Sequence, residues 1–162
     1  MPPTNLLKNP GFELPGLPPT SLTGAHIPGS SAAPHWTTWN NSQATTTTDI
    51  LPSTRPGGGA HMIHVCTTGE NNGLVQVFLP QNSGPQHARS SVWVFVIRGQ
   101  VGMGTGNGGS TSDHDAVSAH VGQWEELQAP NGVHPANEFI VYATSPRGAC
   151  FYIDDATVIG VG

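Results

Sequence analysis

The chain has 162 residues, of which 21 are glycine and 15 are proline, and only 9% are charged, against about 25% in an average protein. With five cationic side chains and a formal net charge of −5, it lacks the basic face that nucleic-acid binding requires. No apolar run approaches the roughly 20 residues of a membrane span, so we expect no membrane contact. The length is that of one ordinary domain, and we predict that residues 1–162 form a single unit.

Hydroxyl and amide side chains supply the polarity that charges supply in other proteins. Such a composition, with β-branched strands, is typical of a secreted all-β protein. The chain begins at Met1 without the apolar region of a secretion signal. We therefore expect a mature protein, a module cut from a longer one, or a protein exported by another route. Cys66 and Cys150 lie in predicted strands, and they form either a disulfide, which fits an oxidising compartment, or two buried thiols.

The predicted elements are β-strands throughout. A short apolar start over residues 5–13 precedes a Pro/Gly-rich segment, 14–35, that we expect to be irregular. Asn72-Gly73 predicts a type I′ hairpin, and residues 99–109 predict a glycine-rich loop. About nine short strands without a helix predict an all-β, antiparallel two-sheet sandwich or jelly roll. The strands are predicted over residues 36–39, 45–50, 61–68, 74–79, 89–98, 116–120, 123–127, 138–143 and 149–159.

The strand over residues 89–98 has two different apolar faces, because side chains alternate along a strand. Its valine face is a natural sandwich interior, which puts its Trp/Phe face outside. Large aromatic side chains on an outer face either need cover, for example by residues 14–35, or form a binding surface. Sugar rings present apolar C–H faces that stack on tryptophan, so we predict that Trp93 is the centre of a carbohydrate site. The valine face comprises Val92, Val94 and Val96, and the other face comprises Ser91, Trp93, Phe95 and Ile97.

Other residues are predicted to surround Trp93 in this site. Gln76 is in the middle of the strand over 74–79, and its amide both donates and accepts hydrogen bonds. Trp39 is expected to supply a second platform at the rim. Strand ends and the glycine-rich loop supply three more candidates. The complete predicted set of ligand-binding residues is Trp93, Gln76, Trp39, Arg98, Asn107 and Tyr142.

No catalytic constellation is evident. Glu125 and Glu126 are adjacent on a strand and so face opposite ways, which prevents the paired action of a glycosidase. Asp154 and Asp155 are expected to diverge in the same way. His61 and His64 are also predicted to point to opposite faces, and no zinc motif is present. The sequence therefore predicts a protein that is not an enzyme.

The two ends of the chain carry acidic residues in an otherwise neutral protein. Glu13 follows the first strand, and Asp154 lies in the last. If such carboxylates are buried they need a cation, and calcium accepts carboxylate and backbone carbonyl oxygens. The alternative is that both are surface acids.

Several segments resemble, in chain order, the strands of the galactose-binding-like jelly rolls, which include the carbohydrate-binding modules of families 4, 9, 16 and 22. The matches run from residue 5 to residue 159, and His35 replaces a glycine that usually precedes the family's early tryptophan. The segments are Asn5–Glu13 (NLLKNPGFE), Trp36, Gly73–Gln76 (GLVQ), Ser91–Val94 (SVWV), Gly122–Leu127 (GQWEEL) and Phe151–Val158 (FYIDDATV).

This resemblance implies a two-sheet jelly roll in which a structural calcium joins the first and last strands. Glu13, Asp154 and carbonyls near Gly11 would hold the ion, and Trp36 and Trp124 would belong to the core. The implied function is a non-catalytic carbohydrate-binding module, an accessory domain tethered to a secreted glycan-active enzyme. The alternative is a structural or protein-interaction β-sandwich, whose Trp/Phe face packs on a neighbouring domain or a second copy.

Overall fold

The computed structural model describes residues 5–7, 22–23, 31–33, 36–39, 45–80, 82–85, 87–107, 110–111, 116–129 and 136–160. Every regular element in these ranges is a β-strand, as the composition predicts. None of the described segments contains a helix of the length and apolarity needed to cross a membrane. The strands are β1 (Leu22–Thr23), β2 (Ser31–Ala33), β3 (Trp36–Trp39), β4 (Thr45–Pro52), β5 (His61–Thr67), β6 (Gly73–Val77), β7 (Ala88–Arg98), β8 (Val101–Asn107), β9 (Ser110–Thr111), β10 (Ala116–Val117), β11 (Trp124–Ala129), β12 (Glu138–Ala143) and β13 (Cys150–Gly160).

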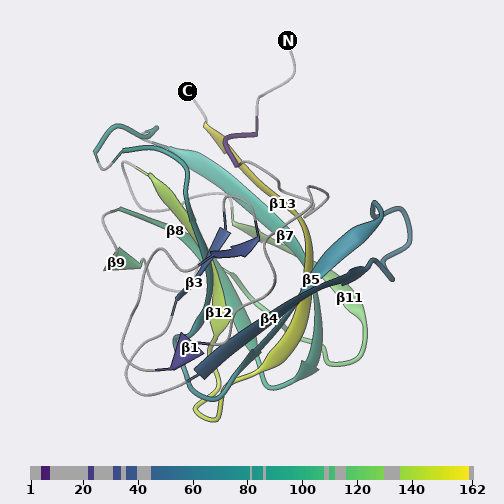
Figure 1. The fold of residues 1–162 in the computed structure, drawn as a ribbon. Helices are drawn as coiled ribbons and strands as arrows, with labels where there is room; N and C mark the ends of the chain where they lie inside the picture. The colour runs from purple at the N-terminus through teal and green to yellow at the C-terminus, as the bar shows by residue number, and fades with distance from the viewer. Residues whose placement is uncertain are drawn as a thin grey trace.

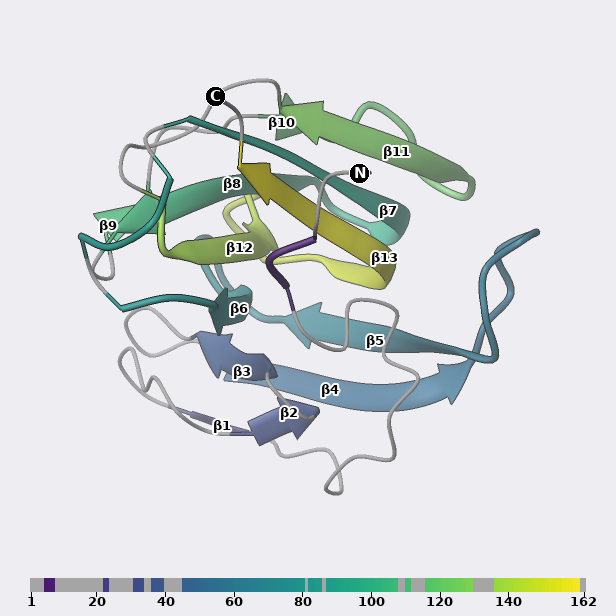
Figure 2. The same cartoon turned by 90° about the horizontal axis from the view of Figure 1, so that it is seen from above.

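The described strands form two antiparallel sheets (Figures 1 and 2). Sheet A has the order β1-β4-β5-β13-β7-β11. Sheet B has the order β10-β8-β12-β6-β3-β2, and the short strand β9 also pairs with β8. The all-β sandwich expected from strand spacing is confirmed, with β5 and β13 in the middle of sheet A.

The core lies between the two sheets. In β7, Val92 and Val94 are fully buried and Val96 is 1% exposed, so the predicted valine face is the interior face. Sheet B contributes Trp36, which is fully buried with its ring edge on Phe139 at a centroid distance of 6.3 Å. Each such side chain contributes roughly 1.5–3 kcal/mol through removal of its apolar surface from water. The prediction that Trp36 is a core residue is confirmed.

The start of the chain runs beside its end. Asn5 forms an antiparallel bridge with Ile159, and its amide donates to the Ala156 carbonyl and accepts from the Val158 N–H, both at 3.0 Å. The Leu6 N–H also donates to the Val158 carbonyl at 2.8 Å. Figure 1 shows residues 5–7, in purple, beside the yellow end of β13. The two ends of the chain, which the resemblance implies are joined, thus lie side by side over these residues.

The glycine-rich segment 99–109 was predicted to be a loop, but its residues Val101–Asn107 form the strand β8. Its glycines alternate with Val101, Met103 and Thr105, all of which are at most 1% exposed. Those three side chains anchor the segment in the core, so the period-2 pattern overrides the loop preference of glycine. Within the predicted irregular segment 14–35, β1 pairs with β4 and β2 pairs with β3.

The predicted hairpin at Asn72-Gly73 is wrong. β5 pairs with β4 and β13 in sheet A, whereas β6 pairs with β12 and β3 in sheet B. The connection therefore crosses from one sheet to the other. Asn71 adopts a positive φ of 64°, and the buried Asn72 amide donates to the carbonyls of Gly69 and Glu70, which stabilises this crossing.

A disulfide joins Cys66 in β5 to Cys150 in β13, which decides between the two alternatives for these cysteines. The two residues are direct register partners, with Cα atoms 4.1 Å apart. The bond closes a loop of 84 residues of sequence separation and restrains the unfolded chain accordingly.

Candidate functional site

The outer face of sheet A, the side turned away from sheet B, carries a row of aromatic side chains across four strands. Register pairing puts His64 of β5 beside Tyr152 of β13, Tyr152 beside Phe95 of β7, and Phe95 beside Trp124 of β11. Neighbouring ring centroids are 5.3, 5.6 and 5.7 Å apart, which is the contact range of aromatic pairs. We call His64, Tyr152, Phe95 and Trp124 the aromatic row.

The aromatic row is half-buried and not enclosed. Trp124 and Tyr152, the two larger rings, are inclined by 32° to one another with centroids 6.4 Å apart. Phe95 lies between them and meets Trp124 edge-on at 67°. The prediction that Trp124 belongs to the core is therefore wrong, because pairing with Phe95 puts it on the outer face.

Trp93 lies on the same outer face, as predicted, but one face of its ring is occupied. The Arg55 guanidinium carbon is 5.0 Å from the centre of the Trp93 ring, a cation–π contact. Arg55 is itself held by ion pairs to Asp154, with Nε–Oδ2 at 3.4 Å, and to Asp155. Trp93 is half-buried under this arrangement and offers less free ring surface than the sequence predicts.

Asp154 is fully buried beside Trp93. Its Oδ2 accepts hydrogen bonds from the Ser53 hydroxyl at 3.0 Å and from Arg55, and its Oδ1 accepts from the Asp155 N–H at 2.9 Å. Burial raises the pKa of Asp154 above its ordinary value, and the charge of Asp155 adds to this rise, while Ser53 and Arg55 oppose it. The carboxylate is thus occupied by protein donors.

The expected divergence of Asp154 and Asp155 is wrong, since both contact Arg55. The register of β13 with β7 shifts between Asp154 and Thr157, and Asp155 has a positive φ of 45°. This β-bulge adds a residue to the strand and brings two adjacent carboxylates to one side.

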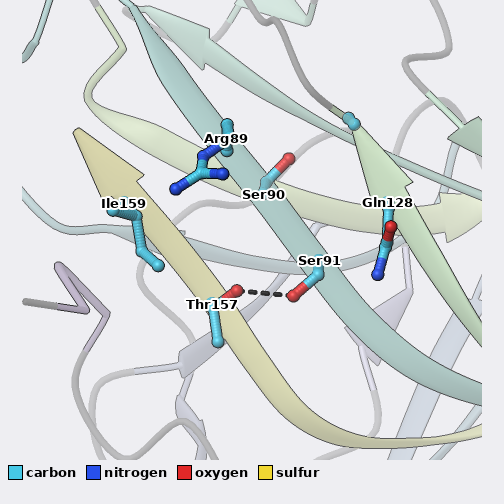
Figure 3. Close-up of a pocket in the computed structure, with 7 residues that line it drawn as sticks. Arg89, Ser90, Ser91, Gln128, Thr157 and Ile159 are labelled. Atoms are coloured by element: carbon cyan, nitrogen blue, oxygen red, sulfur yellow. Dashed lines mark hydrogen bonds between the residues drawn. The ribbon is translucent and has the colours of Figure 1, made fainter. Parts of the chain in front are cut away.

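A depression of about 480 Å³ lies on the same face, around Ser91 of β7 (Figure 3). Register pairing puts Gln128 of β11 and Thr157 of β13 on either side of Ser91. We call Gln128, Ser91 and Thr157 the polar row. The Ser91 and Thr157 hydroxyls share a hydrogen bond of 2.5 Å. The depression is also lined by Arg89, Ser90, Ala129 and Ile159.

The polar row and the aromatic row flank Trp93 on one continuous surface. Ser91, Trp93 and Phe95 follow at two-residue intervals on β7, so the rows are about 13 Å apart at roughly 3.3 Å per residue. Arg89 is exposed and lies across the depression from Gln128 (Figure 3). Among the described acidic residues, none forms an ion pair with Arg89. The surface therefore combines ring faces with hydrogen-bond donors and acceptors.

The six predicted ligand residues do not gather in one place. Trp93 and Arg98 are in sheet A, and the Arg98 guanidinium, at the far end of β7, donates to the Thr67 carbonyl at 3.4 Å. Gln76 was expected on the sheet of Trp93 but lies in sheet B, 2% exposed and paired with the core residue Phe139. The sheet crossing before β6 explains this misplacement.

The remaining three predicted residues are also in sheet B. Tyr142 is 3% exposed and clusters with Val75 and Ile140. Trp39, the last residue of β3, pairs with Gly73, and Asn107 ends β8. The side chains of Trp39 and Asn107 lie outside what the structure describes.

Glu13 and Gly11, two of the three predicted calcium ligands, lie outside the described residues. The third, Asp154, contacts a guanidinium, whose positive charge takes the place that the prediction gave to the metal. The described donors alone therefore do not fit a calcium ion, and we derive no function through one. Calcium binding stays a prediction.

Sequence reasoning missed several residues of this face. Tyr152 was detectable, because it alternates with the apolar Phe151 and Ile153 in the last strand. Arg55 carried no signal, since it lies in a Pro/Gly turn and its partners are 99 and 100 positions away. Ser91 was on the predicted outer face, but its partners depend on strand order.

Comparison with protein-family models and with curated proteins gives no match. Solved structures of similar fold include the C-terminal family 22 carbohydrate-binding module of Clostridium thermocellum Xyn10B, with TM-score 0.59 and 22% identity over 79% of this chain and 87% of that one. The CBM22-1 xylan-binding domain of Paenibacillus barcinonensis Xyn10C has TM-score 0.55 and 16% identity over 99% and 97%. TmCBM61, solved with β-1,4-galactotriose, has TM-score 0.56 and 18% identity over 98% and 99%. The chain thus has the β-sandwich fold of these modules.

Proposed function

We propose that this chain is a non-catalytic carbohydrate-binding module that binds a poly- or oligosaccharide on the outer face of sheet A. The observation that carries the proposal is the aromatic row, in which two large rings, inclined by 32° to one another, are half-exposed on the sheet. The apolar C–H faces of a sugar stack on such rings. The similar fold of xylan-binding and galactotriose-binding modules supports the same class of ligand.

The polar row supplies the second half of the proposed site. Sugar hydroxyls need donors and acceptors in fixed positions, and Gln128, Ser91 and Thr157 offer both kinds. Gln128 is held by a 2.6 Å hydrogen bond from its amide to Glu126. A glycan of several units that crosses Trp93 would therefore contact rings at one end and hydroxyls at the other.

The carboxylates on this face are not placed for catalysis. Asp154 and Asp155 form the closest carboxylate pair on this face, and Arg55 contacts both of them. Asp154 is fully buried and bonded to Ser53 and Arg55, so a substrate has no access to it. Binding without turnover, as an accessory module of a secreted glycan-active enzyme, is the function we infer. The disulfide supports an extracellular location.

The test is a binding screen with the whole chain. Xylan, mixed-linked β-1,3-1,4-glucan and β-1,4-galactan are titrated by calorimetry and by affinity electrophoresis, with dextran as a control. We expect one of the three to bind with a Kd of roughly 10–1000 μM, because a few stacking rings and solvent-competed hydrogen bonds give modest affinity. Release of reducing sugar during the titration, or binding to none of the polymers, would contradict the proposal.

A further inference from the structure

One cluster on the outer face of sheet A lies at the His64 end of the aromatic row. It consists of His64, Cys66 and Cys150, all half-buried, whose ligand-type atoms lie within 4.8 Å of one another. His64 Nε2 is 3.3 Å from Cys66 Sγ. In the oxidised protein the two sulfur atoms are joined in the disulfide and have no thiolate to offer.

The backbone, and not the disulfide alone, brings the three side chains together. His64 and Cys66 are two positions apart on β5 and so share one face. Cys150 of β13 is the direct partner of Cys66, and the pairing continues through Ile153 opposite Ile63. Both strands lie inside sheet A, between β4 and β7. Cleavage of the disulfide therefore leaves two thiols and an imidazole within reach of one ion.

The orientation of the imidazole also matches that of a metal ligand. His64 turns Nε2 toward the sulfur atoms, while Nδ1 lies 3.7 Å from Oδ2 of Asp49, its partner on β4. A histidine that ligates a metal usually directs its second ring nitrogen to a carboxylate, which fixes the tautomer and the ring orientation.

We propose that the reduced protein binds one zinc ion through His64 Nε2 and the thiolates of Cys66 and Cys150, with water in the fourth position. Zinc favours tetrahedral sulfur and nitrogen ligands at about 2.3 and 2.0–2.1 Å. Such bonds need N···S and S···S separations of roughly 3.6 and 3.8 Å, which small side-chain rotations within this cluster provide. The disulfide and the zinc site use the same two sulfur atoms and so exclude one another.

The chemistry balances with a phosphine as reductant. The S–S bond breaks, the two sulfur atoms accept two electrons and two protons, and the phosphine becomes its oxide with an oxygen atom from water. Zinc then displaces the two thiol protons as it binds. Because the metal rejoins β5 and β13, it restores the cross-link that reduction removed.

The test uses the whole chain, reduced with a phosphine, freed of metal and kept under argon. Cobalt(II) titration, followed by zinc competition against a chromophoric chelator, should give one equivalent of metal with thiolate-to-cobalt absorption. Cys66→Ser should abolish that absorption, and His64→Ala and Asp49→Asn should weaken zinc binding tenfold or more. His61→Ala, on the same strand but outside the cluster, should bind zinc as the parent does. The oxidised chain should bind none.

The proposal is overturned by the absence of stoichiometric metal in the reduced chain, and also by equal zinc affinity in His64→Ala and His61→Ala. If reduction unfolds the chain, zinc should restore the near-ultraviolet circular dichroism of the oxidised protein, because binding is then coupled to folding. Failure of zinc to restore that signal overturns the proposal equally.

Discussion

The guanidinium group of Arg55 lies over the ring of Trp93, 5.0 Å from its centre, and joins a turn to the middle of sheet A. The same group is the described counter-charge of the buried Asp154. Arg55 therefore covers one face of the Trp93 ring and neutralises the charge of the buried Asp154 carboxylate.

Replacement of Arg55 by alanine should destabilise the protein by roughly 3–5 kcal/mol, because Asp154 is left buried and unpaired. Urea unfolding of Arg55→Ala measures this, with Arg147→Ala, an exposed arginine, as the control expected within about 0.5 kcal/mol of the parent. In Arg55→Ala/Asp154→Asn much of the loss should be recovered, since the buried charge is gone. A loss below about 1 kcal/mol in Arg55→Ala would show that Asp154 has another counter-charge.

The disulfide should contribute about 2–4 kcal/mol, since it closes a long loop in the unfolded chain. Cys66→Ser/Cys150→Ser measured against the oxidised parent gives the value, as a fall in Tm of roughly 2–4 °C per kcal/mol. Unchanged Tm would mean that the cross-link does not lower the entropy of the unfolded chain by a net amount that stabilises the fold.

Calcium is tested by its removal. If the predicted site at Glu13 and Asp154 is real, a chelator should lower Tm by several degrees, because binding to the folded state alone stabilises it by mass action. Glu13→Gln should make Tm insensitive to the chelator. Equal Tm with and without chelator, and no calcium in elemental analysis, would instead leave Arg55 as the counter-charge of Asp154.

The polar row should contribute to affinity but not to folding. Gln128→Ala removes an exposed amide, so the free energy of unfolding should change by less than about 0.5 kcal/mol while glycan affinity falls three- to tenfold. His120→Ala, an exposed residue away from the depression, is the control. Equal glycan affinity in both variants would remove the depression from the site.

Features of the fold that depend on neighbouring residues in one strand could be predicted from the sequence, whereas features that depend on pairing between distant strands could not. The valine face of β7 followed from alternation within one strand, and so did the outward position of Trp93. Trp124 was misplaced because its face depends on which strand β11 pairs with, and Gln76 because an Asn-Gly signal does not reveal a crossing between sheets. The contact of Asp155 with Arg55 depends on the β-bulge, which no local sequence pattern predicts.

The candidate site was predictable in kind but not in composition. Stacking rings on the outer face of the strand over 89–98 were anticipated, whereas the row that forms them takes one side chain from each of four strands. No single segment of the sequence determines the order of the strands in the sheet or their register. Only the sheet topology therefore identifies Tyr152, His64 and the polar row as parts of the site.

The most direct test of the central claim is the glycan affinity of Trp124→Ala/Tyr152→Ala, measured by calorimetry with the polymer that the screen selects. We predict a loss of at least tenfold, about 1.4 kcal/mol, with the β-sheet circular dichroism retained, because both side chains are half-buried on the outer face. Tyr142→Phe, on sheet B, should bind as the parent does. Full affinity in the double variant would contradict the account, and lost affinity in Tyr142→Phe would move the site to sheet B.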